Sequence, residues 1–287
     1  MSSEHIYELS VSLSGRKASL SGLIRDMLVR LGTDEKDIVE YDEKGRVRLS
    51  VYFSDEKKAV QAVKGFSGLG LKGVPAKLNC LGDSWKTAWK KHIKPFTLAG
   101  RFRVVPLKEE SGVMKMTKKD IYIDSILAFG MGTHPTTKLV AEMMVSTKPG
   151  WDTFFDIGTG TGILAIIASK LGSSTVWAVD IDPESIETAM KNSEGNDVTL
   201  SLIKTADIMK FGRKKKFDLV AANLITHDLL TFRKKILSFV APGGYLIVSG
   251  VSSDNYKTFR RSFDGKGLKC LKAPSERGWH AVMYRYC

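Results

Sequence analysis

The chain has few residues that could crosslink it, ligate a metal or anchor it in a lipid. Its 287 residues include only three cysteines, Cys80, Cys270 and Cys287, whose separations match no common metal site. An odd, scattered set fits a reducing compartment better than a disulfide framework, so we expect a cytoplasmic protein without a metal centre. No apolar run approaches the length of a membrane span, and residues 1–5 do not begin a signal peptide. We therefore expect no membrane partner.

The sequence also lacks low-complexity tracts and internal repeats, and it is short of acidic residues. Its composition, 43% hydrophobic and 26% charged, is that of a globular protein with one large or two smaller domains. The net charge is +13, and residues 83–120 carry ten basic and four acidic side chains, nearly half of that excess. Such a basic segment allows contact with RNA or another acidic partner, and a solvated surface is an equally good interpretation.

The most informative stretch is residues 154–165, where an apolar strand runs into three alternate glycines and an apolar helix. Gly158 and Gly160 permit a tight turn and close approach of the backbone to a ligand, which a Cβ would block. Gly162 opens a helix whose first N–H groups are unpaired and favour a negative group. This pattern predicts a nucleotide-type site at the carboxyl end of a parallel strand.

Two aspartates decide which nucleotide the loop fits. The dinucleotide fingerprint is G-x-G-x-x-G, but here the third glycine comes one residue early, and Asp156 precedes the first. That carboxylate would repel a pyrophosphate, whereas it would attract the amino group of S-adenosylmethionine. Asp180 ends the next apolar run, where an acidic side chain binds a ribose diol. We predict S-adenosylmethionine as the cofactor; the alternative is a plain β–α turn with Asp180 as a solvated strand end.

Further polar residues follow other predicted strands of the same half. Pro135 suits the first position of a helix, which places the hydroxyls of Thr136 and Thr137 in its first turn as a second clamp on the cofactor. His134 could act as a base, cap the helix or hold the loop. Asp207, after a strand at 198–204, could accept from the adenine amino group or be an ordinary loop aspartate.

The order of predicted elements divides the chain into three parts. Residues 1–82 read β-α-β-β-α-β, the ferredoxin-like unit, and we interpret them as a substrate-recognition domain. Residues 83–120 form a basic connector, which opens with a helix carrying Trp85 and Trp89 as either a wall of the site or a docking face. Residues 121–287 alternate strands and helices, which predicts a parallel sheet with an antiparallel edge.

The catalytic half and the connector resemble the PrmA family of methyltransferases, which modify the stalk-base protein of the large ribosomal subunit. The matching stretches are residues 89–96, 129–137, 156–165, 180–183 and 223–225, and the loop with His134 is the most specific of them. The resemblance implies a class I methyltransferase fold, Rossmann-like with a seven-stranded, mostly parallel sheet, and an N-terminal α+β ferredoxin-like domain. It also implies that Thr137, Gly158, Asp180 and Asn223 contact S-adenosylmethionine.

We therefore expect a protein N-methyltransferase acting on lysine or N-terminal amines of a large-subunit ribosomal protein, as a monomer. Asn223 is the expected catalytic residue, since at the end of its strand it can accept a hydrogen bond from the amine and orient its lone pair. Leu224 and Ile225 stand where enzymes acting on planar amines have Pro-Pro-aromatic. The alternatives are an RNA or small-molecule methyltransferase and a non-catalytic binding module.

Overall fold

The computed structural model places two compact units, residues 1–92 and 93–287. Neither unit shares a sheet with the other, and each has its own buried core. The residues that the structure describes are 6–14, 20–31, 33, 38–43, 46–53, 55–68, 71, 74–81, 95–106, 117–124, 132–212, 215–265 and 267–287.

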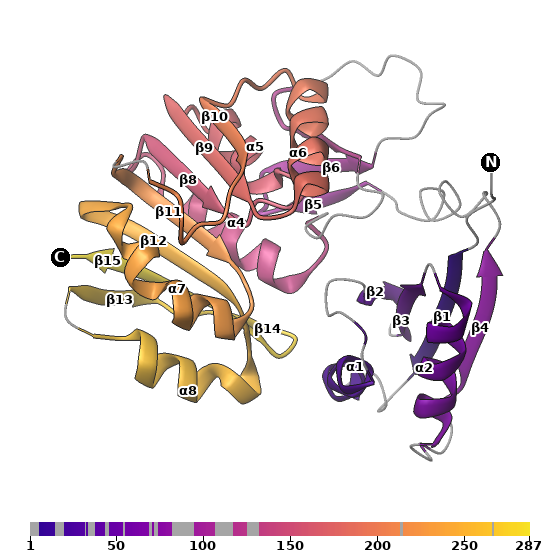
Figure 1. The fold of residues 1–287 in the computed structure, drawn as a ribbon. Coiled ribbons are helices and arrows are strands. Elements are labelled where there is room, and N and C mark those ends of the chain that lie inside the picture. Colours follow the sequence, from indigo (N-terminus) through magenta and orange to yellow (C-terminus); the bar gives the residue numbers. More distant parts are fainter. Residues whose placement is uncertain are drawn as a thin grey trace. The chain divides into compact units, whose positions relative to one another are not determined.

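The N-terminal unit is a four-stranded antiparallel sheet with two helices (Figure 1). Its elements follow one another as β-α-β-β-α-β, in the predicted order, and the strands lie side by side in the order β2-β3-β1-β4. They are β1 (Ile6–Ser14), α1 (Ser21–Arg30), β2 (Ile38–Glu43), β3 (Arg46–Phe53), α2 (Glu56–Gly68) and β4 (Ala76–Leu81).

Alternation along β1 separates the two faces of this sheet. Leu9, Val11 and Leu13 are at most 1% exposed and pack in one core with side chains of α1 and α2. On the opposite face the Glu8 carboxylate accepts hydrogen bonds from Arg48 (2.7 Å) and from two further polar side chains, Ser50 and Asn79. This face is therefore polar and held together by a buried carboxylate.

The start of α2 is capped by an aspartate. Asp55 is the capping side chain, because its Oδ1 accepts from the backbone N–H groups of Lys57 (2.7 Å) and Lys58 (3.2 Å). Aspartate is one of the residues preferred at the start of a helix, because its side chain satisfies N–H groups that have no partner within the helix.

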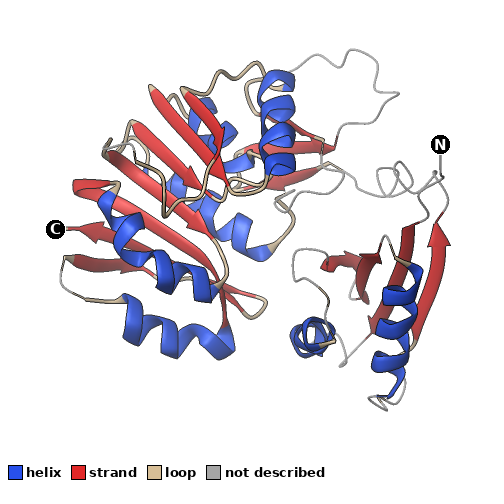
Figure 2. Cartoon of the chain, viewed as in Figure 1, coloured by secondary structure: helices blue, strands red, loops and turns tan. Residues whose placement is uncertain are grey.

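The C-terminal unit contains two sheets and the remaining helices. Strands and helices alternate through its central part, as predicted (Figure 2). Its elements are β5 (Phe96–Leu98), β6 (Phe102–Pro106), β7 (Asp120–Ile123), α4 (Pro135–Thr147), β8 (Thr153–Ile157), α5 (Ile163–Lys170), β9 (Thr175–Asp180), α6 (Pro183–Gly195), β10 (Leu202–Thr205), β11 (Phe217–Asn223), α7 (Thr226–Ser238), β12 (Val240–Ser252), α8 (Ser253–Phe263), β13 (Leu268–Lys272), β14 (Ser275–Glu276) and β15 (Trp279–Tyr286).

The large sheet has the strand order β10-β9-β8-β11-β12-β15-β13, and β14 pairs with β15 beside this path. The first five strands are parallel, and β15, β13 and β14 pair antiparallel at the end of the sheet. The sheet therefore has one short strand, β14, beyond the seven that we expected. The chain leaves β8 toward β9 and β10 and returns to β11 on the other side, so the strand order reverses beside β8. Ligands bind at such switch points.

Helices cover both faces of this sheet. Phe154 and Ala221 point to a core shared with α4 and α5, whereas Phe155 and Val220 point to a core shared with α7 and α8. Alternate residues of one strand thus serve opposite cores, which explains why the central strands read as continuous apolar runs.

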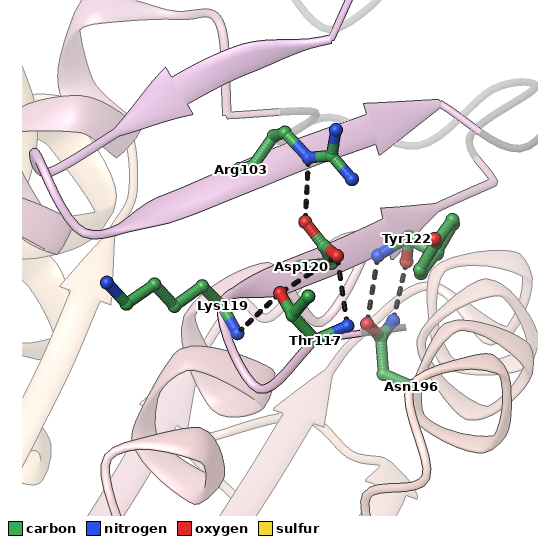
Figure 3. Close-up of polar contacts among 6 residues, drawn as sticks. All are labelled: Arg103, Thr117, Lys119, Asp120, Tyr122 and Asn196. Atoms are coloured by element: carbon green, nitrogen blue, oxygen red, sulfur yellow. Dashed lines mark hydrogen bonds and ion pairs between the residues drawn. The ribbon is translucent and has the colours of Figure 1, made fainter. Parts of the chain in front are cut away.

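A small second sheet, β5-β6-β7, is joined to the same unit (Figure 3). Asn196 of α6's C-terminal cap holds β7 like a neighbouring strand, since its side chain accepts from Tyr122 N (2.9 Å) and donates to Tyr122 O (2.6 Å). Within the sheet, Arg103 Nε donates to the buried Asp120 (2.7 Å).

The predicted connector differs from the observed division of the chain. Residues 93–120, which we assigned to a separate connector, belong to the C-terminal unit, because β6 pairs in parallel with β7. Trp85, Trp89 and the rest of residues 82–94, together with 107–116 and 125–131, lie outside the described part of the chain.

Candidate functional site

The glycine loop joins β8 to α5 with all three glycines in the left-handed region. Gly158, Gly160 and Gly162 have φ angles of 74°, 54° and 80°, which L side chains rarely adopt. A Cβ on Gly158 would lie 2.4 Å from Leu224 Cδ2, too close for any real contact. Glycine is therefore the residue that fits this turn, where the backbone packs closely against Leu224.

Asp156 lies beneath the loop and is fully buried. Its Oδ2 accepts from Thr159 Oγ1 (2.7 Å), while Oδ1 has no hydrogen-bond partner among the described residues. Burial is the main cause that raises the pKa of Asp156 to about 7. The hydrogen bond from Thr159 acts to lower this pKa, whereas the charge of the nearby Asp180 acts to raise it. The group is therefore poised to gain or lose a proton near neutrality and could respond to a nearby cation.

Asp180 stands at the end of β9, beside the glycine loop. Its Oδ2 accepts from Gly160 N (2.9 Å) and its Oδ1 from Asp182 N (3.1 Å), so two backbone amides fix the carboxylate. The side chain is only partly exposed, and burial raises its pKa. Each oxygen keeps a lone pair that could accept from a neighbouring hydroxyl.

The start of α4 meets the end of β11 in a chain of hydrogen bonds. His134 is the N-cap of α4, where its Nδ1 accepts from Thr136 N (3.4 Å) and lies 2.8 Å from Thr136 Oγ1. Asn223 Nδ2 donates to Thr136 Oγ1 (3.2 Å) and Thr137 Oγ1 (3.5 Å). His134 Nδ1 carries no proton, because it accepts the backbone N–H of Thr136. The Thr136 hydroxyl therefore donates to Nδ1, and the Thr136 oxygen is free to accept from the Asn223 amide.

With its amide nitrogen turned toward the two threonines, Asn223 has one atom without a role in the fold, its side-chain oxygen Oδ1. Asn223 Oδ1 is buried and has no hydrogen-bond partner among the described residues. In the register of the sheet, Ala222 is opposite Ile157, so Asn223 is level with Gly158. A buried amide oxygen without a partner costs free energy unless a ligand supplies a donor.

The carboxyl ends of β8, β9 and β11 thus bring most of the predicted residues into one region. Asp207 follows β10, next to β9, and its carboxylate is already used: Oδ1 accepts from Met209 N (2.9 Å), and Oδ2 lies 3.7 Å from Lys210 Nζ. Asp207 therefore has the contacts of an ordinary loop aspartate, which is one of the two interpretations that we gave for it.

Sequence reasoning missed Trp279 and Asn192. The ring of Trp279, from β15, meets His134 edge-on at a centroid distance of 5.1 Å, so the hairpin of β14 and β15 supports the start of α4. Asn192 of α6 donates to Thr161 O (2.9 Å) in the glycine loop and accepts from Asp124 N (2.7 Å). Both contacts join segments far apart in the sequence, and no local spacing signals them.

Within the described residues, no three His, Cys, Asp or Glu side chains gather as a metal site would require. Nor is any described helix both long enough and apolar enough to cross a membrane.

Residues 17–286 match the family described as "Ribosomal protein L11 methyltransferase (PrmA)". The chain belongs to this family. A relative of that name from Bacillus cereus is 34% identical over 210 residues, 71% of this chain and 65% of its own length. One from Limosilactobacillus fermentum is 28% identical over 226 residues, covering 78% of this chain and 71% of the relative.

A solved structure of ribosomal protein L11 methylase from Lactobacillus delbrueckii subsp. bulgaricus is similar in fold, with a TM-score of 0.60 and 27% identity. The similarity covers 68% of this chain and 99% of that one. With the mostly parallel sheet, it establishes the mixed α/β methyltransferase fold that the sequence predicted. The match to the PrmA family includes residues of both units. The chain covers slightly less than two thirds of the length of the Bacillus cereus relative, 65%.

Proposed function

We propose that this PrmA family chain is an S-adenosylmethionine-dependent N-methyltransferase that acts on amines of a large-subunit ribosomal protein. The observation that carries the proposal is the buried Oδ1 of Asn223, oriented by two threonine hydroxyls and left without a partner among the described residues. An acceptor at the end of a central strand, level with the glycine loop, is placed to receive an N–H group of the methyl-accepting amine.

The residues around it fit the cofactor. Asp180 would accept from the ribose hydroxyls, since backbone amides already hold its carboxylate in place. Asp156 and the Gly158, Gly160 and Gly162 turn would hold the amino-acid end, and a cation there would favour the ionised form of the Asp156 carboxyl. Thr136, Thr137 and Asp207 would complete the clamp. S-adenosylmethionine supplies an electrophilic methyl group when it is bound.

Residues of the chain contribute mainly position to such a transfer. Asn223 Oδ1 accepts from the amine and turns its lone pair toward the methyl group. His134 and Thr136 fix the direction of the Asn223 amide, so they act as positioning residues. A site that excludes water also lowers the pKa of an ammonium group, which must lose its proton before it attacks.

The family favours a protein substrate over RNA or a small molecule. We propose that the N-terminal unit, with its ferredoxin-like order of elements, recognises this substrate through the polar face around Glu8. Both aliphatic amines, lysine and the N-terminus, suit a site in which Leu224 and Ile225 follow Asn223. A ribosomal substrate would place the activity in the cytoplasm, and one chain contains every group assigned here, which supports a monomer.

The test incubates the full chain with radiolabelled S-adenosylmethionine and ribosomal proteins prepared from cells that lack the enzyme. We expect label in one large-subunit protein, none with Asp180→Ala at limiting cofactor, and retention with Glu187→Gln, an exposed carboxylate change on α6. Label in RNA alone would overturn the substrate class, and binding of NAD in preference to S-adenosylmethionine would overturn the cofactor.

A further inference from the structure

The outer surface of the β5-β6-β7 sheet carries a basic depression of about 400 Å³. None of its lining residues is among those assigned above, and its exposed side chains are all basic or hydroxyl-bearing. Its lining consists of Thr97, Arg101, Phe102, Arg103, Thr117, Lys119 and Asp120.

Arg103 is held in place at this depression by a single buried carboxylate. Its Nε donates to Asp120 Oδ1 (2.7 Å), while Asp120 Oδ2 accepts from Thr117 N (3.0 Å) and Thr117 Oγ1 (2.9 Å). Figure 3 shows that Nε is the guanidinium nitrogen joined to that carboxylate, while neither terminal nitrogen of Arg103 has a contact drawn to it. Among the described residues neither has a partner, so a two-pronged donor is fixed and unused.

Two further cations line the same depression. Arg101, whose guanidinium lies 5.9 Å from the Phe102 ring centre, and Lys119 are exposed and have no acidic partner within the described part of the chain. Asp120, the one acidic residue of the lining, is 2% exposed and already paired with Arg103. The depression therefore presents an excess of positive charge to solvent.

We propose that this depression binds phosphate groups of an RNA backbone, with Arg103 as a bidentate contact and Arg101 and Lys119 as flanking cations. A guanidinium with two free terminal nitrogens matches a phosphate in geometry. Docking sites for a folded protein centre on aromatic or arginine anchors in desolvated pockets, whereas Phe102, the only aromatic residue of the lining, is 2% exposed and Arg101 and Arg103 are open to solvent. Phosphate contacts need only charge and hydroxyl donors, and the chain's pI of about 9.5 fits a nucleic-acid partner.

The test measures binding of the full chain to a fluorescein-labelled RNA hairpin by anisotropy, from 50 to 300 mM salt. The variant Arg101→Gln/Lys119→Gln leaves the Arg103–Asp120 pair intact. For each phosphate that a variant no longer binds, the slope of log affinity against log salt should fall by about one. We expect the double variant to lower that slope by about two and to weaken binding roughly tenfold at the lowest salt.

The matched control is Lys234→Gln/Lys257→Gln, which removes the same charge from exposed positions of α7 and α8. It should bind RNA like the wild type. Equal losses in the two double variants would overturn the site and leave only non-specific attraction. Tighter binding of labelled polyglutamate than of RNA, abolished by Arg101→Gln/Lys119→Gln, would overturn the choice of partner. Arg103→Lys, which keeps the charge but not the fork, should weaken RNA binding severalfold in a chain whose melting temperature is checked alongside.

Discussion

Asp156 couples the protonation of one residue to the stability of the C-terminal unit. Its pKa in the folded chain, about 7, exceeds the usual value near 3.9 of an unfolded aspartate. The folded state therefore binds the proton more tightly, and the stability from this group is complete below pH 4 and lost as the pH rises through 7.

The Asp156→Asn variant keeps the shape of the side chain and removes its titration. We expect the variant to be more stable than the wild type at pH 8 by a few kcal/mol, with a difference that shrinks toward pH 4. Urea unfolding of both proteins from pH 4 to 8 without cofactor measures it. A difference that does not change with pH would contradict the raised pKa.

Asn223 should matter for turnover more than for cofactor binding. Asn223→Ala removes the acceptor that orients the amine, so we expect the single-turnover rate on the ribosomal substrate to fall about 10²-fold, as for a misplaced reactant. The dissociation constant for S-adenosylmethionine, measured by calorimetry, should change only severalfold. A normal rate would exclude Asn223 from the mechanism.

The variant His134→Asn separates positioning from acid–base chemistry, because asparagine is also a good helix cap. Its rate should exceed that of Asn223→Ala, with an unchanged pH profile. A larger loss, recovered at high pH, would instead identify His134 as a general base.

At the scale of elements, local sequence patterns predicted turns and helix ends. The glycine loop and the start of α4 at Pro135 lie where their spacing placed them. The match of residues 17–286 confirmed the family, which the His134 loop indicated most specifically.

Contacts between segments far apart in the sequence could not be predicted from local patterns. The bond from Asn223 to Thr136 spans 87 residues, and Asn196 holds Tyr122 across 74. Such pairings depend on the order of strands in the sheet, which the sequence pattern leaves open. The same reason explains why the parallel pairing of β6 with β7, and with it the true boundary of the C-terminal unit, was missed.

Asn196 should therefore contribute more to the free energy of unfolding than an ordinary polar residue does. It makes three buried hydrogen bonds, to both backbone groups of Tyr122 and to Asn192 O (2.7 Å). Asn196→Ala leaves two backbone groups of β7 unpaired, at a cost of about 1–3 kcal/mol for each buried group. Urea unfolding should show this loss, whereas Glu194→Ala, at an exposed position of α6, should change the free energy of unfolding far less. Equal effects would mean that β7 does not depend on this side chain.

At the scale of the whole chain, the two units divide the proposed work. Every group assigned to the cofactor lies between residues 134 and 223, inside the C-terminal unit. The N-terminal unit has its own core of Leu9, Val11 and their neighbours, and its other face is polar, around Glu8. A unit with its own core can in principle fold alone.

Deleting residues 1–92 should therefore leave residues 93–287 folded and able to bind S-adenosylmethionine with nearly the affinity of the full chain. Methylation of the ribosomal protein should collapse, because the surface proposed to recognise it is gone. The comparison uses calorimetry for the cofactor and transfer of label for the substrate. If the shortened chain methylates that protein at the full rate, the N-terminal unit does not recognise it. Arg48→Ala, in the full chain, tests the same surface independently, since it removes an exposed partner of Glu8 while the cofactor site is unchanged. A full methylation rate in this variant would place recognition outside the polar face of the sheet.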